Sequence, residues 1–417
     1  MQQTAPRKIV TASMIGNILE YYDFTLFGFL SPLLAPLFFP AFDPLTSLIA
    51  ALATYGVGYF MRPLGAAFFG YVGDKYGRKR ALSFSIILMS VPTVLIAFLP
   101  TYEQIGILAP IILILLRLLQ GFCTGGEYNG AGIYVVENVN IKKAGFFGSL
   151  ITISSAIGGL SANVVSSIVT LPLMPTWGWR LAFLVGGVIG GIGLYMRKKL
   201  PDNSLQEIRA NNEVRPKVPL YQAITQHYRS MICTIGIAAF SGAMYNISFS
   251  YTSVFLSTHA EWHLSDSLFL MSLGTIVYIL TVPCAGFLAD RFGNKRVMLT
   301  GALATLICIY PLFLTLLSAK TLYQALVVQV CLALLAAWFQ APMNAYMAKL
   351  FPVKIRYSGL ALSYNIGIAL FGGTTPMICS ILIRWTGQQI MPAFYIILIS
   401  LIGIGAVLLS KPREALA

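Results

Sequence analysis

The chain has 417 residues, of which 57% are hydrophobic and only 10% are charged, and it carries a formal net charge of +14. This composition is too apolar for an ordinary soluble enzyme and indicates an integral membrane protein. The basic residues stand at the ends of apolar segments with no base-reading or stacking module between them, so the charge reflects membrane topology and argues against a nucleic-acid partner.

Apolar segments long enough to cross a lipid bilayer recur along the whole chain. A helix needs about 20 apolar residues to span a hydrocarbon core of ~30 Å, and each segment here ends at a short polar or charged turn. The pattern predicts an all-α integral membrane protein with twelve transmembrane helices, at residues 12–38, 46–72, 80–99, 105–136, 145–170, 180–198, 230–257, 266–289, 296–318, 322–348, 357–383 and 389–410.

The distribution of Lys and Arg predicts the orientation of these helices. An even number of spans places both termini on one side, and the turns on that side hold most of the basic residues, among them Lys79, Lys143 and Lys349. Cytoplasmic loops are enriched in Lys and Arg. We therefore expect a multi-pass protein of the inner (plasma) membrane with both termini in the cytoplasm.

The first span contains two acids in the stretch "GNILEYYDFTLFGF", residues 16–29. Glu20 lies 12 residues beyond Lys8, which is about 18 Å along a helix and near the middle of the membrane. Asp23 follows three residues later. An ionised side chain at this depth costs about 2.5–3.5 kcal/mol on insertion scales, so such groups are normally paired or functional. The aromatic residues around them are expected mainly to pack and to face lipid, with contact to a cavity as the alternative for Tyr21 and Tyr22.

Two arginines are expected near the same depth. Arg117 lies about 12 residues into the fourth span, which runs in the opposite direction, and Arg62 lies deep in the second span. One interpretation is a set of static buried ion pairs that fix the register of the helices. We favour a functional one, in which one of Glu20 and Asp23 pairs with an arginine and the other takes up and releases a proton. Arg117, and Arg62 beside it, then bind a substrate carboxylate or compete for the acid, and the sequence leaves open which acid has which role.

The second half of the chain offers neutral hydrogen-bonding groups where the first half has charges. Tyr245, Asn246 and Tyr251 lie in the seventh span, and Gln340 and Asn344 lie four residues apart in the tenth. Such groups suit substrate selection, and interhelical hydrogen bonding is the alternative for each of them.

A polar turn recurs once in each half of the chain. It reads "GYVGDKYGRKRAL" at residues 70–82 and "GFLADRFGNKRVM" at residues 286–298. The recurrence predicts a duplicated unit of six helices. We expect an N-terminal bundle at residues 1–198, a cytoplasmic linker at 199–229 and a C-terminal bundle at 230–417.

At these motifs the sequence resembles the major facilitator superfamily, whose signature turn between its second and third spans is similar to "GDKYGRKR". Three stretches resemble its metabolite:proton symporter branch, which includes transporters of proline and betaine, 2-oxoglutarate, citrate and shikimate: "GNILEYYDFTLFGF", "MRPLGAAFFGYVGDKYGRKR" and "LLRLLQGFCTGGEYNGAGIYVVE". "KIRYSGLALSYNIG" supports the resemblance in the second half. It implies two six-helix bundles around a central cavity that is lined by spans one, four, seven and ten.

The resemblance also implies that the two polar turns act as conformational latches at a cytoplasmic gate. Asp74 and Asp290 are expected to accept hydrogen bonds at a neighbouring helix N-terminus, whose dipole favours anions. For the basic residues, topology determination alone is the alternative. Glu127 is expected in the inner vestibule or in a structural pair. The gate candidates are Asp74, Arg78, Arg80, Glu137, Asp290, Arg291 and Arg356.

These features together predict a secondary active transporter that couples inward proton flow to the uptake of a small carboxylate-bearing metabolite, by alternating access. We expect a monomer in the lipid bilayer, with the metabolite and protons as partners and without a cofactor or metal. An exporter or uncoupled facilitator of the same fold is the nearest alternative, and a metabolite sensor that does not transport is a more distant one. An enzyme is disfavoured because the spans hold no nucleophile and base pair or metal constellation.

Overall fold

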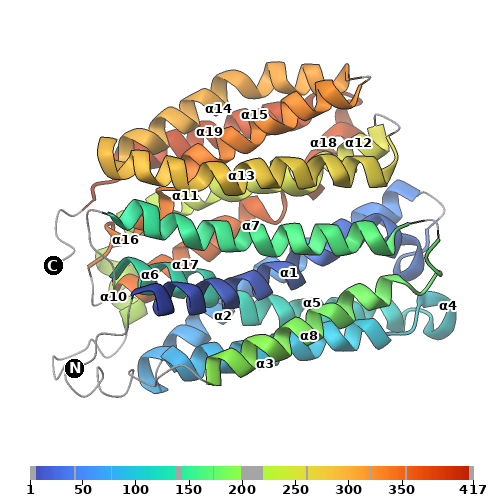
Figure 1. Cartoon of the computed structure of the whole chain (residues 1–417), viewed down its shortest axis with the longest axis horizontal. Coiled ribbons are helices and arrows are strands. Elements are labelled where there is room, and N and C mark those ends of the chain that lie inside the picture. The colour runs from blue at the N-terminus through green and yellow to red at the C-terminus, as the bar shows by residue number, and fades with distance from the viewer. Residues whose placement is uncertain are drawn as a thin grey trace.

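The computed structural model describes residues 6–41, 44–76, 78–137, 143–171, 173–198, 219–259, 262–319, 321–352 and 355–412. The regular elements in these ranges are helices, and the long ones run along a common axis, alternately up and down (Figure 1). Nine of the described helical segments are long and apolar enough to cross a membrane, and Phe84–Phe98 and Trp179–Tyr195 are shorter apolar helices. Together with α1 (Pro6–Phe38), these segments account for the twelve predicted spans.

The first half contributes six of these spans. They are α1, α2 (Pro44–Tyr76), α3 (Arg78–Phe98), the pair α5 (Leu108–Thr124) and α6 (Glu127–Glu137), α7 (Ala144–Val169) and α8 (Trp179–Lys198), with the short α4 (Tyr102–Ile105) before α5. Of the predicted linker, the described part begins at residue 219 and contains α10 (Pro219–Gln226).

The second half contributes the other six spans. They are α11 (Tyr228–Asn246) with η2 (Ile247–Tyr251) and α12 (Thr252–His259), α13 (Leu264–Phe292), α14 (Asn294–Leu317), α15 (Leu322–Gln340) with α16 (Met343–Ala348), α17 (Arg356–Gly367) with η4 (Ile368–Gly372) and α18 (Thr375–Thr386), and α19 (Met391–Leu409).

Four spans are interrupted near the middle of the molecule. The fourth breaks at Gly125 and Gly126, the tenth breaks before Met343 at Pro342, and the seventh and eleventh each contain a turn of π-helix. A proline has no N–H to donate to the preceding turn, and single π-helical turns within α-helices are found frequently at functional sites. The interruptions place irregular backbone near the cavity between the two halves.

Within the first half, α2 and α5 pack with their backbones in contact. A Cβ atom added at Gly121 of α5 would lie 1.8 Å from the carbonyl oxygen of Gly58 of α2, and one added at Gly65 would lie 1.7 Å from that of Phe122. Small residues allow this approach, and van der Waals packing of this kind holds helices together in a membrane. It fixes the positions of Arg62 on α2 and Arg117 on α5.

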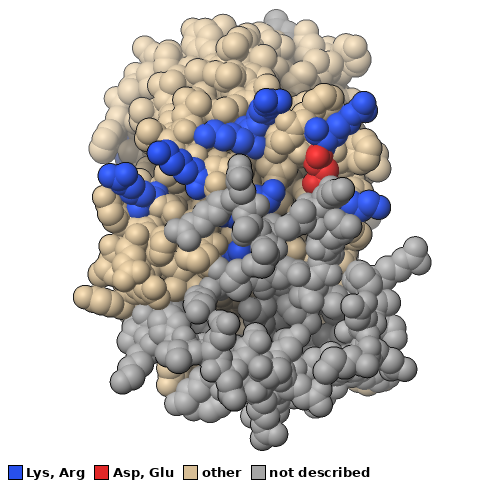
Figure 2. All heavy atoms as spheres, turned by 90° about the vertical axis from the view of Figure 1, so that its left-hand side faces the viewer, with Lys and Arg blue, Asp and Glu red and all other residues tan. Residues whose placement is uncertain are grey.

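The two halves meet along two seams. In one, α7 lies beside α13 over its length (Figure 1), and in the other, α2 packs against α17, η4 and α18. The beginning of α1 and the end of α19 lie at the same end of the molecule. Lys and Arg gather on this end (Figure 2), which we call the basic end, with Arg291, Arg296, Lys349 and Lys411 among its described residues. Its position on the cytoplasmic side stays a prediction.

Candidate functional site

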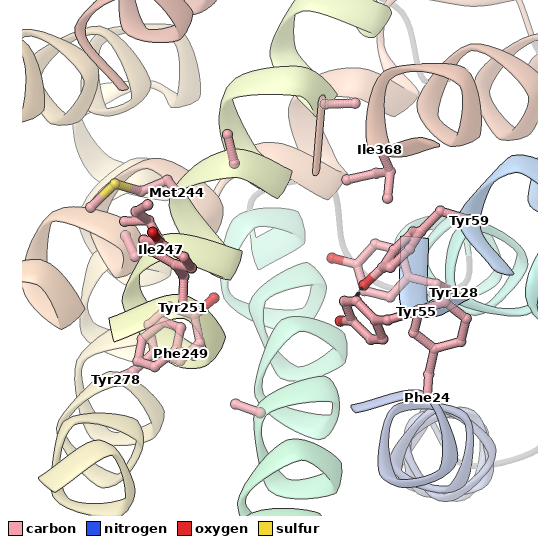
Figure 3. Close-up of a cluster of buried hydrophobic side chains, with 14 of the residues drawn as sticks. Phe24, Tyr55, Tyr59, Tyr128, Met244, Ile247, Phe249, Tyr251, Tyr278 and Ile368 are labelled. Atoms are coloured by element: carbon pink, nitrogen blue, oxygen red, sulfur yellow. Dashed lines mark hydrogen bonds between the residues drawn. The ribbon is translucent and has the colours of Figure 1, made fainter. Parts of the chain in front are cut away.

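A small cavity of about 30 Å³ lies between the two halves. Its wall includes the guanidinium group of Arg62, the amides of Asn246 and Gln340, and six tyrosines, which are Tyr21, Tyr59, Tyr128, Tyr245, Tyr278 and Tyr364. Figure 3 shows how aromatic side chains of the two halves face each other across this region. The cavity has room for only one or two water molecules.

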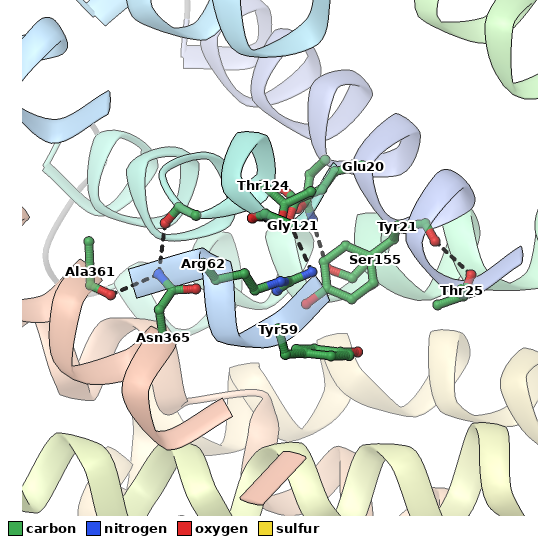
Figure 4. Close-up of polar contacts among 12 residues, drawn as sticks. Glu20, Tyr21, Thr25, Tyr59, Arg62, Gly121, Thr124, Ser155, Ala361 and Asn365 are labelled. Carbon is green, nitrogen blue, oxygen red and sulfur yellow. Dashed lines mark hydrogen bonds and ion pairs between the residues drawn. The ribbon is translucent and has the colours of Figure 1, made fainter. Parts of the chain in front are cut away.

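Glu20 and Arg62 form a buried ion pair beside the cavity. Nη2 of Arg62 lies 3.5 Å from Oε1 of Glu20, and the two side chains are 3% and 0% exposed. The guanidinium group also lies over the rings of Phe24 and Tyr59, 4.2 Å and 4.7 Å from their centroids. Figure 4 shows Arg62 extending past Tyr59 toward Glu20. One of the two acids in the first span therefore has an arginine partner, which is Arg62.

Asp23 has different surroundings, between α1, α3 and α8. The hydroxyl of Thr93 on α3 donates a hydrogen bond of 2.8 Å to Oδ2 of Asp23. The other oxygen, Oδ1, has no hydrogen-bond partner among the described residues, although the side chain is only 4% exposed. It faces the backbone of Gly186 on α8, where an added Cβ would lie 2.4 Å from Oδ1. Asp23 thus points away from the cavity.

A chain of hydrogen bonds joins Asp23 to Arg117. Nη1 of Arg117 donates to Oε1 of Gln120 at 3.0 Å, and Nε2 of Gln120 donates to Oγ1 of Thr93 at 2.7 Å. Thr93 completes the chain to Asp23. The buried cation and the buried carboxylate are therefore connected through two neutral side chains, with each donor oriented toward the acid.

Arg117 is fully buried among aromatic rings. Its guanidinium carbon lies 4.8 Å and 4.7 Å from the ring centroids of Phe24 and Phe27, distances at which a cation is attracted to an aromatic face. Arg117 was predicted as a substrate ligand, but in this conformation it lies behind the described residues of the cavity wall. Arg62, and not Arg117, lies in the cavity wall.

Three of the predicted neutral residues of the second half line the cavity, and hydrogen bonds hold two of them in place. Oδ1 of Asn246 accepts a bond of 3.4 Å from the hydroxyl of Tyr55, and Nδ2 donates to the carbonyl of Gly242 at 3.0 Å. Oε1 of Gln340 accepts a bond of 2.6 Å from Tyr278. Tyr245 is the third, and its ring lies against Tyr21 of the first half.

The other two neutral candidates lie elsewhere. Tyr251 is buried within η2, next to Phe255. Asn344 lies toward the basic end, where its Nδ2 donates to the hydroxyls of Tyr128 at 3.2 Å and Thr152 at 3.3 Å. Asn344 therefore forms hydrogen bonds to the opposite half. Interhelical hydrogen bonding of this kind was the alternative to a role in substrate selection.

Asp290 at the end of α13 caps the first turn of α7 in the other half. Its Oδ1 accepts a hydrogen bond of 2.7 Å from the N–H of Gly145, and its Oδ2 accepts one of 2.9 Å from the N–H of Phe146. A carboxylate at a helix N-terminus satisfies free N–H groups and is favoured by the helix dipole. The contact joins the two halves at the basic end.

The remaining gate candidates are only partly described. Arg291 is exposed, and Arg356 is buried, with its Nε donating to the carbonyl of Phe351 at 3.4 Å. The side chains of five further candidates lie outside the described part of the structure: Asp74, Arg78, Arg80, Glu127 and Glu137. A gating role for all of these residues stays a prediction.

Further hydrogen bonds close the molecule at both ends. Near the basic end, Asn365 and Tyr357 of α17 donate to the carbonyls of Gly125 and Gly126, at 2.7 Å and 2.8 Å, at the break in the fourth span. Toward the opposite end, Nδ2 of Asn163 on α7 donates to the carbonyl of Leu268 on α13 at 3.0 Å. The described residues of the two halves therefore contact each other on both sides of the cavity.

Sequence reasoning missed several residues of this region. Thr93 and Gln120 carry no charge and were not singled out, although Gln120 lies three residues after Arg117 and hence on the same helix face. Tyr21 was expected mainly to pack, with cavity contact as the alternative, and its ring both packs against Tyr128 and Tyr245 and lines the cavity. The tyrosines come from helices distant in sequence, so only the fold brings them together.

Comparisons with known proteins agree with this architecture. A family model described as Major Facilitator Superfamily matches residues 13–278 and 234–416. The chain is 36% identical over 411 residues to a proline/betaine transporter of Salmonella typhimurium, covering 95% of this chain and 82% of the relative. The identity and both coverages are the same for a glycine betaine/proline/ectoine/pipecolic acid transporter, OusA, of Dickeya dadantii. An ectoine/proline transporter of Corynebacterium glutamicum is 33% identical over 421 residues, with 95% and 83% covered.

A solved structure with the same fold is that of the proton:xylose symporter XylE bound to 6-bromo-6-deoxy-D-glucose. It aligns with a TM-score of 0.79 and 15% sequence identity over 98% of this chain and 95% of that one. This likeness confirms the predicted fold of two six-helix bundles. By the family model and its relatives, the chain belongs to the major facilitator superfamily and is a multi-pass membrane transporter.

Proposed function

We propose that this protein is a proton-coupled importer of a small zwitterionic solute, of the proline or betaine type, that works by alternating access. The observation that carries the proposal is that the two buried acids of the first span have different partners. Glu20 is paired with Arg62 beside the cavity, whereas Asp23 has one oxygen without a described partner and is connected to Arg117. The names of the curated relatives support the substrate class.

The cavity wall has the groups that a zwitterion requires. The guanidinium of Arg62 offers hydrogen bonds and charge to a carboxylate. Tyrosine rings such as Tyr21, Tyr128 and Tyr245 offer aromatic faces, which attract the positive charge of an ammonium group. A bound carboxylate competes with Glu20 for Arg62, so substrate binding changes the balance of charge beside the cavity.

Asp23 is the group that we assign to the proton. When it is protonated, its negative charge disappears and Arg117 loses the anion at the far end of the hydrogen-bonded chain. When it is ionised, Thr93 and Gln120 point their donors toward it. Protonation therefore changes the interactions of α1, α3 and α5 together, which gives a proton a means to bias the conformation.

The small volume of the cavity requires the two halves to move during transport. A cavity of about 30 Å³ is too small for proline or betaine. Solute must enter when one end has opened and leave when the other has opened, as in alternating access. An entering proton gains about 2.3 kcal/mol per 100 mV of membrane potential, which is sufficient to drive accumulation.

The test compares Asp23→Asn with Glu20→Gln in proteoliposomes, using labelled proline and betaine and an imposed pH gradient. Asp23→Asn is expected to lose gradient-driven accumulation and to keep exchange of labelled for unlabelled solute, because exchange needs only the loaded carrier to reorient. Glu20→Gln is expected to lose both, because a buried Arg62 without its anion is costly, by about 3–5 kcal/mol.

Glu103→Gln is the matched control, since Glu103 is an exposed acid on α4, and it is expected to behave as the unmodified protein. If both Asp23→Asn and Glu20→Gln still concentrate solute in response to the gradient, proton coupling through these acids is refuted and an uncoupled facilitator becomes the better description.

A further inference from the structure

A second hollow opens on the outer surface of the first half, at the end opposite the basic end. It has a volume of about 460 Å³ and lies where α3 ends and α8 begins, with Ala97, Phe98, Gln104, Trp177, Arg180 and Leu184 in its wall. We call it the α3–α8 groove. The two helices lie side by side on the side of the molecule away from the second half (Figure 1), so the groove is separate from the central cavity.

The floor of this groove lies close to Asp23. Thr93, which donates to Asp23, is four residues from Ala97 along α3, or about 6 Å. Gly186, which faces Oδ1 of Asp23, is two residues from Leu184 along α8, or about 3 Å. Along both helices, a residue that contacts Asp23 therefore lies one turn or less from a residue of the groove wall.

The backbone of a glycine on α8 lies against Asp23. A Cβ at Gly186 would lie 2.4 Å from Oδ1, and one at the adjacent Gly187 would lie 2.4 Å from Cγ2 of Val94 on α3. The oxygen that faces this seam is the one without a hydrogen-bond partner among the described residues. A buried acceptor without a partner is costly and is ready to receive a proton or a water molecule.

The mouth of the groove is polar enough to hold water. Nη1 of Arg180 donates to the carbonyls of Ala97 and Leu99, at 2.7 Å and 2.9 Å, and Gln104 adds an amide. Trp177 is 53% exposed there, as is typical of aromatic residues at the membrane surface. Water is stable in a hollow that has such polar partners.

The central cavity offers Asp23 a poorer connection. Asp23 is not part of the cavity wall, and the ring of the next residue, Phe24, packs against Tyr59 of that wall, with 4.4 Å between ring centroids, and under the guanidinium of Arg117. The ionisable groups near Asp23 are engaged elsewhere. Tyr22 donates its hydroxyl to the carbonyl of Ala182 at 2.8 Å, and Arg117 reaches Asp23 only through Gln120.

We propose that protons reach Asp23 through the α3–α8 groove, so that the proton and the solute enter by separate routes. A hydronium ion in the groove transfers its proton to Oδ1 of Asp23, which forms the carboxyl O–H bond and leaves a water molecule behind. The proton passes when α3 and α8 separate slightly at Gly186 and Gly187. The proposal rests on the proton role of Asp23 stated above.

The test adds a bulky cation to the floor of the groove after the protein has folded. Leu184→Cys in proteoliposomes is treated with a membrane-impermeant methanethiosulfonate that carries a trimethylammonium group. Gradient-driven accumulation is expected to fall about tenfold or more, because a fixed positive charge near Asp23 repels the incoming proton. Exchange of labelled for unlabelled solute is expected to change less than about twofold, since exchange needs no proton movement.

The matched control is Val188→Cys, one turn further along α8 on its outer surface, outside the groove wall. The treated protein without a new cysteine measures any effect on its native thiols. Mass spectrometry establishes the extent of modification. Failure of the thiol introduced by Leu184→Cys to react overturns the proposal, because the groove is then dry. Full modification with unchanged accumulation, or with equal loss of accumulation and exchange, also overturns it.

Asp23→Asn, assayed in parallel, separates this proposal from the one on which it rests. If Asp23→Asn abolishes accumulation and the modified Leu184→Cys does not, the proton role stands and the route through the groove is wrong. If Asp23→Asn still accumulates solute, the proton role itself fails.

Discussion

The opposite charges of Arg117 and Asp23 compensate each other inside the protein, although the two side chains are not in contact. A buried charge is normally compensated by an opposite charge or by several hydrogen bonds. Here the compensation passes through Gln120 and Thr93, whose donors all point toward the acid. Such a chain is sensitive to the charge of the acid, since a hydrogen bond from Thr93 is stronger to an ionised carboxylate than to a protonated one.

Substitutions at Gln120 test the role of this hydrogen-bonded chain. Gln120→Leu removes the acceptor of Arg117 and the donor to Thr93, so we expect a loss of about 1–3 kcal/mol in stability from the partners left unsatisfied. We also expect gradient-driven accumulation to fall more than exchange does. Gln120→Glu keeps the acceptor for Arg117 and loses only the donor, so it is expected to recover most of the stability.

Melting temperature in detergent and the two transport assays provide the measurements. Gln388→Leu, at an exposed glutamine after α18, is the control for replacing an amide by an apolar group. Equal transport and equal melting temperature in Gln120→Leu and Gln388→Leu would show that the chain has no part in coupling.

The sequence predicted that charged residues lie deep in the first half, but not which of them meet. Glu20 and Asp23 are three residues apart, so their side chains differ in direction by about 60° around the helix. That rotation is enough to turn Glu20 toward α2 and Asp23 toward α3 and α8. The neighbours on each side depend on helix packing, which residue spacing within one helix does not determine.

Broken helices are the main feature at the scale of the elements. Hydropathy predicted the fourth, seventh, tenth and eleventh spans as continuous, because it detects apolar length and not backbone geometry. At the break, the carbonyls of Gly125 and Gly126 accept hydrogen bonds from Asn365 and Tyr357 of the other half. The carbonyl of Gly126 also accepts one of 3.3 Å from the N–H of Gly130, so it is shared between the helix and the other half. The interruption therefore lies at a contact between the halves.

The close contact of α2 with α5 leads to a prediction about glycine. At Gly121 a methyl group would lie 1.8 Å from a backbone oxygen, so Gly121→Ala must push the two helices apart. We expect a loss of about 1–3 kcal/mol or more in stability, together with displacement of Arg117. Gly191→Ala is the matched control, because at this position on α8 an added Cβ meets nothing within 4 Å.

Thermal unfolding in detergent, followed by fluorescence or by retention of monodisperse protein, is the measurement for both variants. Alanine favours a helix over glycine by about 1 kcal/mol, so Gly191→Ala is expected to be neutral or slightly stabilising. A melting temperature for Gly121→Ala at or above that of Gly191→Ala would contradict the direct backbone contact of α2 and α5.

The whole molecule consists of two similar bundles that are held together at both ends. The repeated polar turn predicted the duplication, because a motif at the same place in each half is visible in one sequence. It could not predict an enclosed conformation, since the open and closed arrangements of such bundles use the same helices and differ only by contacts between halves. Asp290 with α7, and Asn163 with α13, are contacts of this kind.

If transport requires each end to open in turn, then locking either end must stop it. At the end opposite the basic end, Nδ2 of Asn163 lies 3.0 Å from Oγ of Ser272. At the basic end, an added Cβ at Gly286 would lie 2.9 Å from Cβ of Ser149. Bonded cysteines have Cβ atoms about 3.5–4.5 Å apart. At Gly286 and Ser149 the Cβ atoms must therefore move slightly apart, whereas at Asn163 and Ser272, where the distance joins the ends of two side chains, the helices must move closer together.

We therefore expect the oxidised pairs Asn163→Cys with Ser272→Cys, and Ser149→Cys with Gly286→Cys, each to abolish both accumulation and exchange, and a reducing agent to restore them. The four single variants, oxidised in the same way, control for the native cysteines and for the substitutions themselves. Full cross-linking at one end with transport unchanged would mean that this end does not open during the cycle.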